Sequence, residues 1–246
     1  MYRVYIATTL AICTIANTHA NPLLKGFTAH YDVSRNGMAL GVIKRELVAD
    51  DDGTLTFLST TIAEGMVALF VKDIIAEEST ILFKNNVLKP LRYQYLKTGG
   101  KKQQHIAVTF DWGKNIFSHS TTKKSSPLPA DSHDLLSFQL DLSKGLSQGQ
   151  EKFAYTIIDH KRVQTHSLRI TGKETLSTSK GKLLATRLEQ EKNNHRYWFT
   201  FWCVPELHYL PIIIRKTEYD GDKITMRLRQ YNGQAFKIKK AGDDDF

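Results

Sequence analysis

The regular alternation of apolar and polar side chains is the feature that most limits what this chain can fold into. Within residues 27–33, every second side chain is apolar or aromatic, from Phe27 to Val33. A period of two residues is typical of a β-strand that buries one face. Comparable segments occur at 40–47, 55–60, 80–83, 91–97, 105–110, 115–119, 153–159, 163–170, 173–178, 182–191, 196–203, 211–219 and 223–231.

Short polar turns separate these segments. They contain glycine beside asparagine, aspartate, lysine or another glycine, at 36–37, 52–53, 99–100, 180–181 and 220–221. Such residues tolerate the positive φ angles that tight hairpins need. Parallel strands require a crossover of a dozen residues or more, so short turns predict antiparallel pairing. The predicted fold class is therefore mainly β.

Two segments depart from the alternation and predict short helices. Residues 62–76 place Ala63, Met66 and Phe70 at helical spacing. The second segment, 129–142, offers Asp131 or Ser132 as an N-cap before a leucine-rich run. It follows the polar stretch 118–129, which would suit a domain linker.

We instead predict a crossover within a single domain, residues 21–236. Each half alone would leave one face of its sheet unburied. The last residues, 237–246, are charged and lack any periodicity, which predicts a disordered tail.

The N-terminus has the layout of a cleavable secretory signal. A basic start precedes the apolar run 4–15, and Thr18 and Ala20 frame a small-residue cleavage site. Residues 1–20 are therefore predicted to be removed. The run is too short to span a bilayer, so we expect no transmembrane segment in the mature chain. The predicted location is the periplasm.

Only two cysteines are present, and the first falls within the predicted signal. Lipidation at Cys13 is disfavoured because the branched Ile12 stands where the attachment signal needs a small residue. Cys203 would then be alone, so no internal disulfide can form. The fold must depend on a packed core.

The formal net charge of +9 is spread in small groups at 101–102, 123–124 and 237–240. Groups of this size indicate a solvated surface. Outside the cytoplasm, the anions within reach are phospholipid head groups and lipopolysaccharide, and nucleic acid is not expected as a partner.

Motifs of serine acyl enzymes occur but in the wrong order. Ser120 and Ser177 each begin an S-x-x-K match, and K-T-G at 97–99 precedes both. Penicillin-recognising enzymes have the serine motif first, on a helix. No G-x-S-x-G is present, and Cys203 lies among aromatic residues that supply no base.

The sequence also lacks the motifs of metal sites and of enzymes that use paired carboxylates. The histidines are scattered, without H-E-x-x-H or C-x-x-C spacing. His133 and Asp134 precede the midpoint helix and are interpreted as a capping cluster. The acidic residues at 50–52 are interpreted as a turn, and those at 77–78 as the end of a helix. We therefore expect no metal, no cofactor and no enzymatic activity.

The densest feature is the aromatic segment 197–202. On a strand, Phe199 and Phe201 would face one way, and Trp198 and Trp202 the other. Apolar side chains on both faces mean that neither face is freely solvated. Two interpretations remain open: packing in the core on both sides, or an apolar groove for an acyl chain.

Several short motifs resemble an exported bacterial family, domain-of-unknown-function family 3108. They are 27–37 with Gly41, 88–93, 110–112, 128–129, 134–137, 172–174, 180–181, Trp202 and 210–212. The family has no assigned activity, so the resemblance carries over no catalytic residue. The closing pattern, Trp202 followed by Leu210-Pro211, is also similar to periplasmic lipoprotein carriers.

Those carriers wrap a curved antiparallel sheet around helices and hold acyl chains inside. The resemblance implies a strongly curved sheet or partial barrel, with one or two short helices packed on its concave face. Such likeness is a fold-level analogy.

We therefore expect a non-enzymatic periplasmic protein that binds or carries a hydrophobic or amphipathic ligand. Lipid, lipoprotein and lipopolysaccharide are the expected partners. The residues predicted to line the cavity are Met66, Trp198, Phe201, Trp202 and Tyr209. Two alternatives remain: an envelope scaffold that pairs with a partner protein through an open sheet edge, and a cell-envelope hydrolase.

Overall fold

The computed structural model describes residues 22–122, 124–192 and 196–238. The predicted signal, 1–20, lies outside the described residues. The strands of the first half are β1 (Phe27–Arg35), β2 (Met38–Ala49), β3 (Thr54–Ala63), β4 (Ile74–Lys84), β5 (Val87–Thr98), β6 (Gln104–Asp111), β7 (Ile116–His119) and β8 (Ser125–Pro127). Those of the second half are β9 (Ser132–His133), β10 (Lys152–Ile158), β11 (Val163–Thr178), β12 (Gly181–Gln190), β13 (Tyr197–Val204), β14 (Leu210–Glu218), β15 (Lys223–Tyr231) and β16 (Gln234–Ala235). The helical elements are η1 (Pro22–Lys25), η2 (Gly65–Leu69), α1 (Ser137–Ser147) and η3 (Pro205–Leu207).

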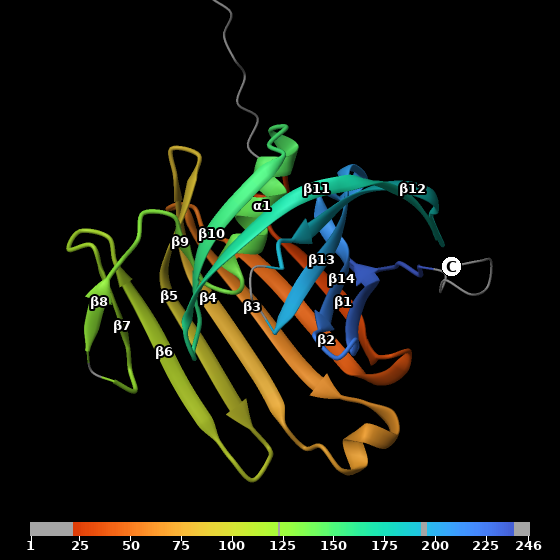
Figure 1. Cartoon of the computed structure of the whole chain (residues 1–246), viewed down its shortest axis with the longest axis horizontal. Coiled ribbons are helices and arrows are strands. Elements are labelled where there is room, and N and C mark those ends of the chain that lie inside the picture. The colour runs from red at the N-terminus through yellow and green to blue at the C-terminus, as the bar shows by residue number, and fades with distance from the viewer. Residues whose placement is uncertain (1–21, 123, 193–195, 239–246) are drawn as a thin grey trace, which may run out of the picture.

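All these strands belong to one sheet (Figure 1). Its order is β8-β7-β6-β5-β4-β3-β2-β1-β15-β14-β13-β12-β11-β10-β9, and β16 pairs with β15. Every pairing is antiparallel except that of β9 with β10. The predicted mainly β, antiparallel fold is confirmed, and the β1–β15 ladder joins the two halves into one sheet.

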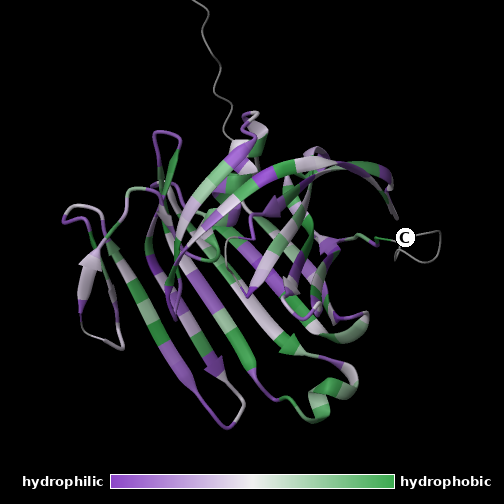
Figure 2. Ribbon diagram, viewed as in Figure 1, coloured by the Kyte–Doolittle hydropathy of each residue, from purple (hydrophilic) through white to green (hydrophobic). Residues whose placement is uncertain are grey.

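The prediction of a strongly curved sheet or partial barrel was wrong. The sheet is neither closed nor strongly curled, and its path ends at β8 and β9. These two strands have three and two residues, so each end offers few backbone groups for a closing ladder. Figure 2 shows apolar and polar residues alternating along many strands, as expected for a sheet with one buried face.

The first predicted helix, 62–76, is mostly extended chain. β3 continues to Ala63 and β4 begins at Ile74, and between them only the short η2 forms. Ladder hydrogen bonds compete for the flanking residues, because Ile62 pairs with Ile74 across β3 and β4. Gly65 also has a positive φ of 61°, which ends the extended strand.

The second predicted helix is confirmed as α1, with a later start than expected. Asp134, rather than Asp131 or Ser132, satisfies its first backbone donors. The Asp134 Oδ1 atom accepts hydrogen bonds from the N–H groups of Leu136 and Ser137, both at 2.8 Å. This places the acidic group where the helix dipole favours it.

Helix α1 contributes to two apolar clusters. Leu140, together with Leu136 just before the helix, belongs to a large cluster that includes Tyr31, and Phe138 and Leu142 belong to a second one. The second cluster joins the helix to residues of β10, β11, β12, β13 and β14. Strands from both halves of the sheet, β5, β10 and β14, contact the same helix.

The end of the described chain is more ordered than predicted. The N–H of Lys237 donates to Ser179 Oγ at 3.0 Å, and Ile238 forms a β-bridge with Thr178. The rest of the predicted tail, 239–246, lies outside the described residues.

Replacing Leu142 with alanine should lower the free energy of unfolding by about 2–5 kcal/mol, because its side chain is fully buried in the second cluster. Chemical denaturation with urea would measure the change. Val163→Ala, at an exposed position, is the matched control and should stay within about 0.5 kcal/mol of wild type. Equal effects of the two substitutions would contradict the assigned role of α1.

Candidate functional site

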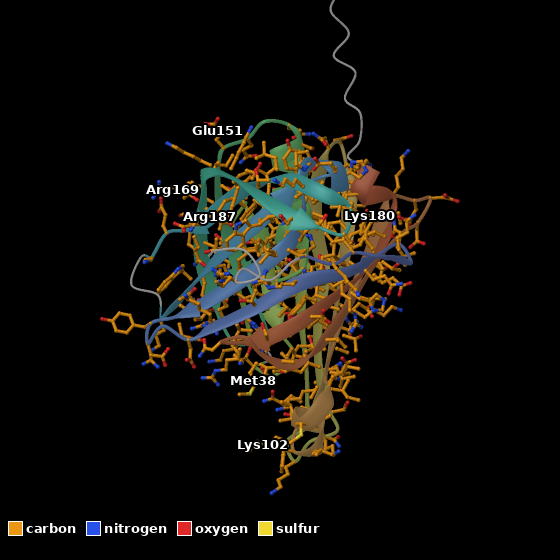
Figure 3. All side chains as sticks on the ribbon, turned by 90° about the vertical axis from the view of Figure 1, so that its right-hand side faces the viewer. Met38, Lys102, Glu151, Arg169, Lys180 and Arg187 are labelled. Carbon is orange, nitrogen blue, oxygen red and sulfur yellow. The ribbon has the colours of Figure 1, made fainter. Side chains whose placement is uncertain are left out.

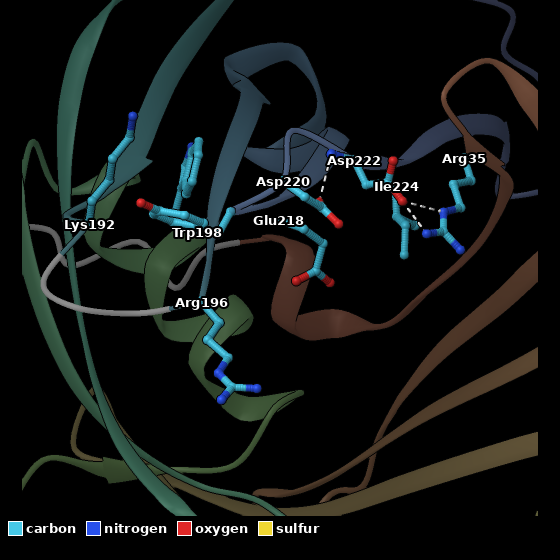
Figure 4. Close-up of a pocket in the computed structure, with 9 residues that line it drawn as sticks. Arg35, Lys192, Arg196, Trp198, Glu218, Asp220, Asp222 and Ile224 are labelled. Atoms are coloured by element: carbon cyan, nitrogen blue, oxygen red, sulfur yellow. Dashed lines mark hydrogen bonds and ion pairs between the residues drawn. The ribbon is translucent and has the colours of Figure 1, made fainter.

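A cavity of about 870 Å³ lies where β1, β13, β14 and β15 meet their connecting turns (Figure 4). Its lining combines three basic side chains, three carboxylates and three large side chains. The residues are Arg35, Lys192, Arg196, Trp198, Glu218, Tyr219, Asp220, Asp222 and Ile224. We call this set the hairpin pocket. Its volume falls within the range typical of small-molecule sites.

Two tight turns build one wall of the hairpin pocket. Asn36, in the turn between β1 and β2, donates from Nδ2 to Asp222 Oδ1 at 2.8 Å, and its Oδ1 accepts the N–H of Lys223 at 2.8 Å. Arg35 Nε donates to Asp222 Oδ2 at 2.9 Å. These hydrogen bonds, Arg35 first among them, hold the pKa of Asp222 below its usual range. The turn before β15 is thereby fixed against the end of β1.

The opposite wall carries the aromatic residue and two cations. Trp198 is half-buried on β13, and the Lys192 Nζ atom lies 4.2 Å from the centre of its ring. This is cation–π geometry. The backbone O of Arg196 accepts the N–H of Tyr219 at 2.8 Å, which ties the start of β13 to the turn after β14.

The carboxylates of the hairpin pocket already have partners. Glu218 pairs with Lys216, Asp222 pairs with Arg35, and Asp220 accepts the N–H of Asp222 at 3.1 Å. Within the described part of the chain, no carboxylate lies within ion-pair distance of Lys192 or Arg196. Lys192 and Arg196 therefore lie without an ion-pair partner beside the apolar surfaces of Trp198 and Ile224, and Asp220 is the one lining carboxylate that no described cation pairs with.

The structure does not gather the five predicted site residues around one cavity. Only Trp198 lines the hairpin pocket. Met66 is 77% exposed in η2 and belongs to neither apolar cluster, because its segment forms a surface loop rather than the predicted buried helix. Its expected place in a cavity wall beside the aromatic residues is not observed.

Phe201 and Trp202 are buried on opposite faces of β13. Phe201 packs against Phe138 of α1, with ring centroids 6.2 Å apart. Trp202 Nε1 donates to Glu174 Oε2 at 2.7 Å, and the Arg215 guanidinium lies 5.0 Å from its ring centre. Core packing, the first interpretation of the aromatic segment, describes both residues.

Tyr209 lies in the turn that connects β13 to β14. It has a positive φ of 61°, its N–H donates to Val204 O at 2.8 Å, and its carbonyl accepts from Ser143 Oγ of α1 at 3.0 Å. Its side chain packs at the border of the second cluster.

A second polar group lies inside the protein between the sheet and α1. Arg45 of β2 is buried, donates to Gln139 Oε1 at 2.8 Å, and lies 5.3 Å from the ring centre of Tyr31. Glu77 of β4 accepts a hydrogen bond from the Tyr93 hydroxyl. Burial raises the pKa of Glu77, while Tyr93 and Arg45 act in the opposite direction.

Asp134 extends this group to the start of α1. Besides capping the helix, its Oδ2 accepts a hydrogen bond from Ser79 of β4. Burial raises the pKa of Asp134, and the hydrogen bonds from Ser79 and the helix N–H groups partly offset this effect. The sequence correctly indicated a capping role, but it did not indicate that the carboxylate is buried.

The structure shows no reactive cysteine and no metal site among the described residues. Cys203 is buried, and this burial raises the pKa of its thiol, which keeps the sulfur protonated. No group of three or more His, Cys, Asp or Glu side chains among the described residues is arranged to hold a metal ion. Nor does any described helix have the length and apolar character needed to cross a membrane.

A model of the family described as "Protein of unknown function (DUF3108)" matches residues 27–229. The chain belongs to this family. No match was found among curated proteins. The resemblance to DUF3108 found in the sequence is therefore confirmed over nearly all of the described chain.

The DUF3108 fold is also similar to a solved structure. The crystal structure of a beta-barrel-like protein of domain of unknown function DUF1849, from Brucella abortus, aligns with a TM-score of 0.55 and 12% sequence identity. The alignment covers 87% of this chain and 98% of that one. At this identity the likeness shows a shared fold only.

Sequence reasoning missed most of the hairpin pocket because its residues come from turns. The turns at 36–37 and 220–221 were recognised, but their meeting depends on the β1–β15 pairing, which unites distant parts of the chain. A usable signal was present, since Arg35 and Asp222 each adjoin a recognised turn and carry opposite charges.

Glu77→Gln should become progressively more stabilising, relative to wild type, as pH rises from about 4 to about 8. The folded-state pKa of Glu77 is raised above its ordinary value of 4.5. The carboxyl therefore contributes stability below about pH 4.5, and this contribution is lost as pH rises through the folded-state pKa. Urea unfolding across this pH range would measure the difference.

Glu206→Gln, at an exposed position on η3, controls for the loss of one carboxylate. A variant that became less stable than wild type at high pH would show that the attraction between Glu77 and Arg45 outweighs the burial of the charge.

Proposed function

We propose that this protein is a non-enzymatic envelope protein that binds or carries an amphipathic ligand, a lipid or acyl chain with an anionic head group, in the hairpin pocket. We further propose that it does so in the periplasm, as the secretory layout of residues 1–20 suggests. The observation that carries the proposal is that two cations without an ion-pair partner, Lys192 and Arg196, lie beside apolar surface in one cavity.

The chemistry of the lining supports an anionic head group. Lys192 and Arg196 have no ion-pair partner among the described residues, whereas Asp222 and Glu218 are ion-paired and Asp220 accepts a backbone N–H. A phosphate or carboxylate bound there would form charge-assisted hydrogen bonds, and arginine is suited to bidentate contacts.

The remaining lining supports an apolar tail. Trp198 and Ile224 offer apolar surface, and Tyr219 adds an aromatic residue that is 87% exposed. Covering such surface with an acyl chain is favourable at about 25 cal/mol per Å². A small inorganic ion would leave this surface in contact with water.

The geometry of the sheet edges argues against a scaffold that adds strands to a partner. β8 and β9, the ends of the sheet path, have three and two residues, and β8 ends in Pro127. Short strands and proline are means by which proteins prevent edge-to-edge pairing. The described residues that line the hairpin pocket include no serine or histidine, so they give no support to a hydrolase.

The test is binding of monomeric amphiphiles measured by isothermal titration calorimetry. We expect palmitate and lysophosphatidylglycerol to bind more tightly than lysophosphatidylcholine. Arg196→Ala should weaken binding of the anionic probes by about tenfold, the effect of losing one charge-assisted hydrogen bond. Arg169→Ala, an exposed arginine on β11, is the matched control and should bind like wild type.

Tryptophan fluorescence gives a second readout at the apolar end of the site. Trp198→Phe should abolish most of the spectral change on binding, whereas Trp112→Phe should preserve it. Absence of binding to all three amphiphiles, or equal loss in the Arg196 and Arg169 variants, would overturn the proposal.

A further inference from the structure

An exposed apolar segment projects from the sheet between β3 and β4. It consists of Met66, Leu69, Phe70 and Val71, and we call it the apolar tip. Met66 and Phe70 are 77% and 84% exposed, and none of the η2 residues is buried. Figure 2 shows this segment as a strongly hydrophobic loop. Contiguous exposed apolar surface of this kind marks an interaction site.

The apolar tip is held in shape by its own hydrogen bonds. The N–H groups of Phe70 and Val71 both donate to Val67 O, at 3.1 and 2.9 Å, and Lys72 Nζ donates to Ala68 O at 2.7 Å. The exposure of its side chains is therefore a feature of the folded loop.

The neighbouring β5–β6 turn supports this loop. A Cβ atom at Gly99 would lie only 2.0 Å from Lys72 O, so the two turns are in close contact and a side chain there would clash. Lys97 and Asp73 form an ion pair of 2.6 Å across the same junction.

Positive charge surrounds the apolar tip. Lys72 follows it directly, and Lys101 and Lys102 are exposed in the adjoining β5–β6 turn. No carboxylate of the described residues lies within ion-pair distance of these three lysines. The nearby acids are engaged elsewhere, because Asp73 pairs with Lys97 and Glu64 lies 3.9 Å from Arg229.

The apolar tip protrudes rather than forming a groove. In Figure 1 the η2 loop and the β5–β6 turn both extend from the lower edge of the sheet, and in Figure 3 they form a narrow projection that carries Lys102. Aromatic and aliphatic side chains flanked by lysines are the pattern of segments that enter the interface of an anionic membrane.

We propose that the apolar tip docks this protein onto an anionic lipid bilayer, with its apolar side chains in the interface and Lys72, Lys101 and Lys102 against the head groups. Strand register places the tip at the same end of the sheet as the hairpin pocket, because Gly41 of β2 pairs with both Val33 of β1 and Ala63 of β3. The docking itself rests on the tip residues alone and does not require that the pocket bind a ligand.

The first test is co-flotation of the full chain with vesicles of phosphatidylcholine containing about 30% phosphatidylglycerol. Leu69→Ser with Phe70→Ser should reduce binding by about tenfold or more, because both apolar side chains leave the interface. Val87→Ser, an exposed apolar position at the opposite end of β5, should bind like wild type. Every variant carries the same N-terminal segment, so a difference in vesicle binding between variants measures the contribution of the apolar tip.

The second test concerns charge. Lys101→Ala with Lys102→Ala should weaken binding several-fold, and binding of wild type should fall in about 1 M NaCl, where the Debye length is roughly 3 Å. Lys25→Ala with Lys84→Ala removes the same charge from the opposite end of the sheet and should have little effect. Equal losses in the two double variants would mean that only net charge matters, which would overturn the proposal.

The third test locates the contact. In a Trp198→Phe background, which removes the tryptophan of the hairpin pocket, Phe70→Trp should add a blue-shifted emission with vesicles and quenching by brominated lipids, whereas Val87→Trp should add neither. Circular dichroism would verify that all variants fold. No quenching at position 70, or a tip-dependent dimer in light scattering without vesicle binding, would overturn the proposal and assign the tip to another partner. Failure of amphiphile binding in calorimetry would leave these outcomes unaffected.

Discussion

The burial of α1 against strands from both halves of the sheet is the interaction on which the rest of the structure depends. One helix supplies Leu140 to one apolar cluster and Phe138 and Leu142 to the other. Cys203, the cysteine among the described residues, is a free thiol, so in this part of the chain the shared packing and the sheet ladders hold the two halves together. The burial of α1 also explains why Asp134 is buried, because this carboxylate caps the helix where the helix start meets β4.

The fold class was predictable because it depends on local patterns. Alternation and turn residues are properties of short segments, and they indicated an antiparallel sheet and the midpoint helix. The failure at 62–76 has a physical cause. Helical spacing of apolar residues was present, but Ile62 and Ile74 are paired in a hairpin whose ladder the periodicity could not reveal. The sheet's degree of curvature was taken from a distant resemblance and was wrong.

The candidate site was predicted less well, because it depends on contacts between distant segments. The aromatic segment was predicted to have no freely solvated face, and Phe201 and Trp202 are core residues. The cavity instead joins Trp198 to charged residues from three hairpin ends. Isolated charged residues near turns look like ordinary solvated surface in a sequence, and only the strand order brings them together.

The β1–β15 ladder has a consequence for how the protein acquires its structure. Ala29 pairs with Tyr231, so the first strand reaches its second neighbour only after more than two hundred residues have been made. Closing so long a loop has a large entropic cost, and sheets with such distant pairings fold slowly. Until β15 emerges, β1 has an unpaired edge that is open to aggregation. A chain of this design would benefit from a chaperone that shields its early strands until synthesis is complete.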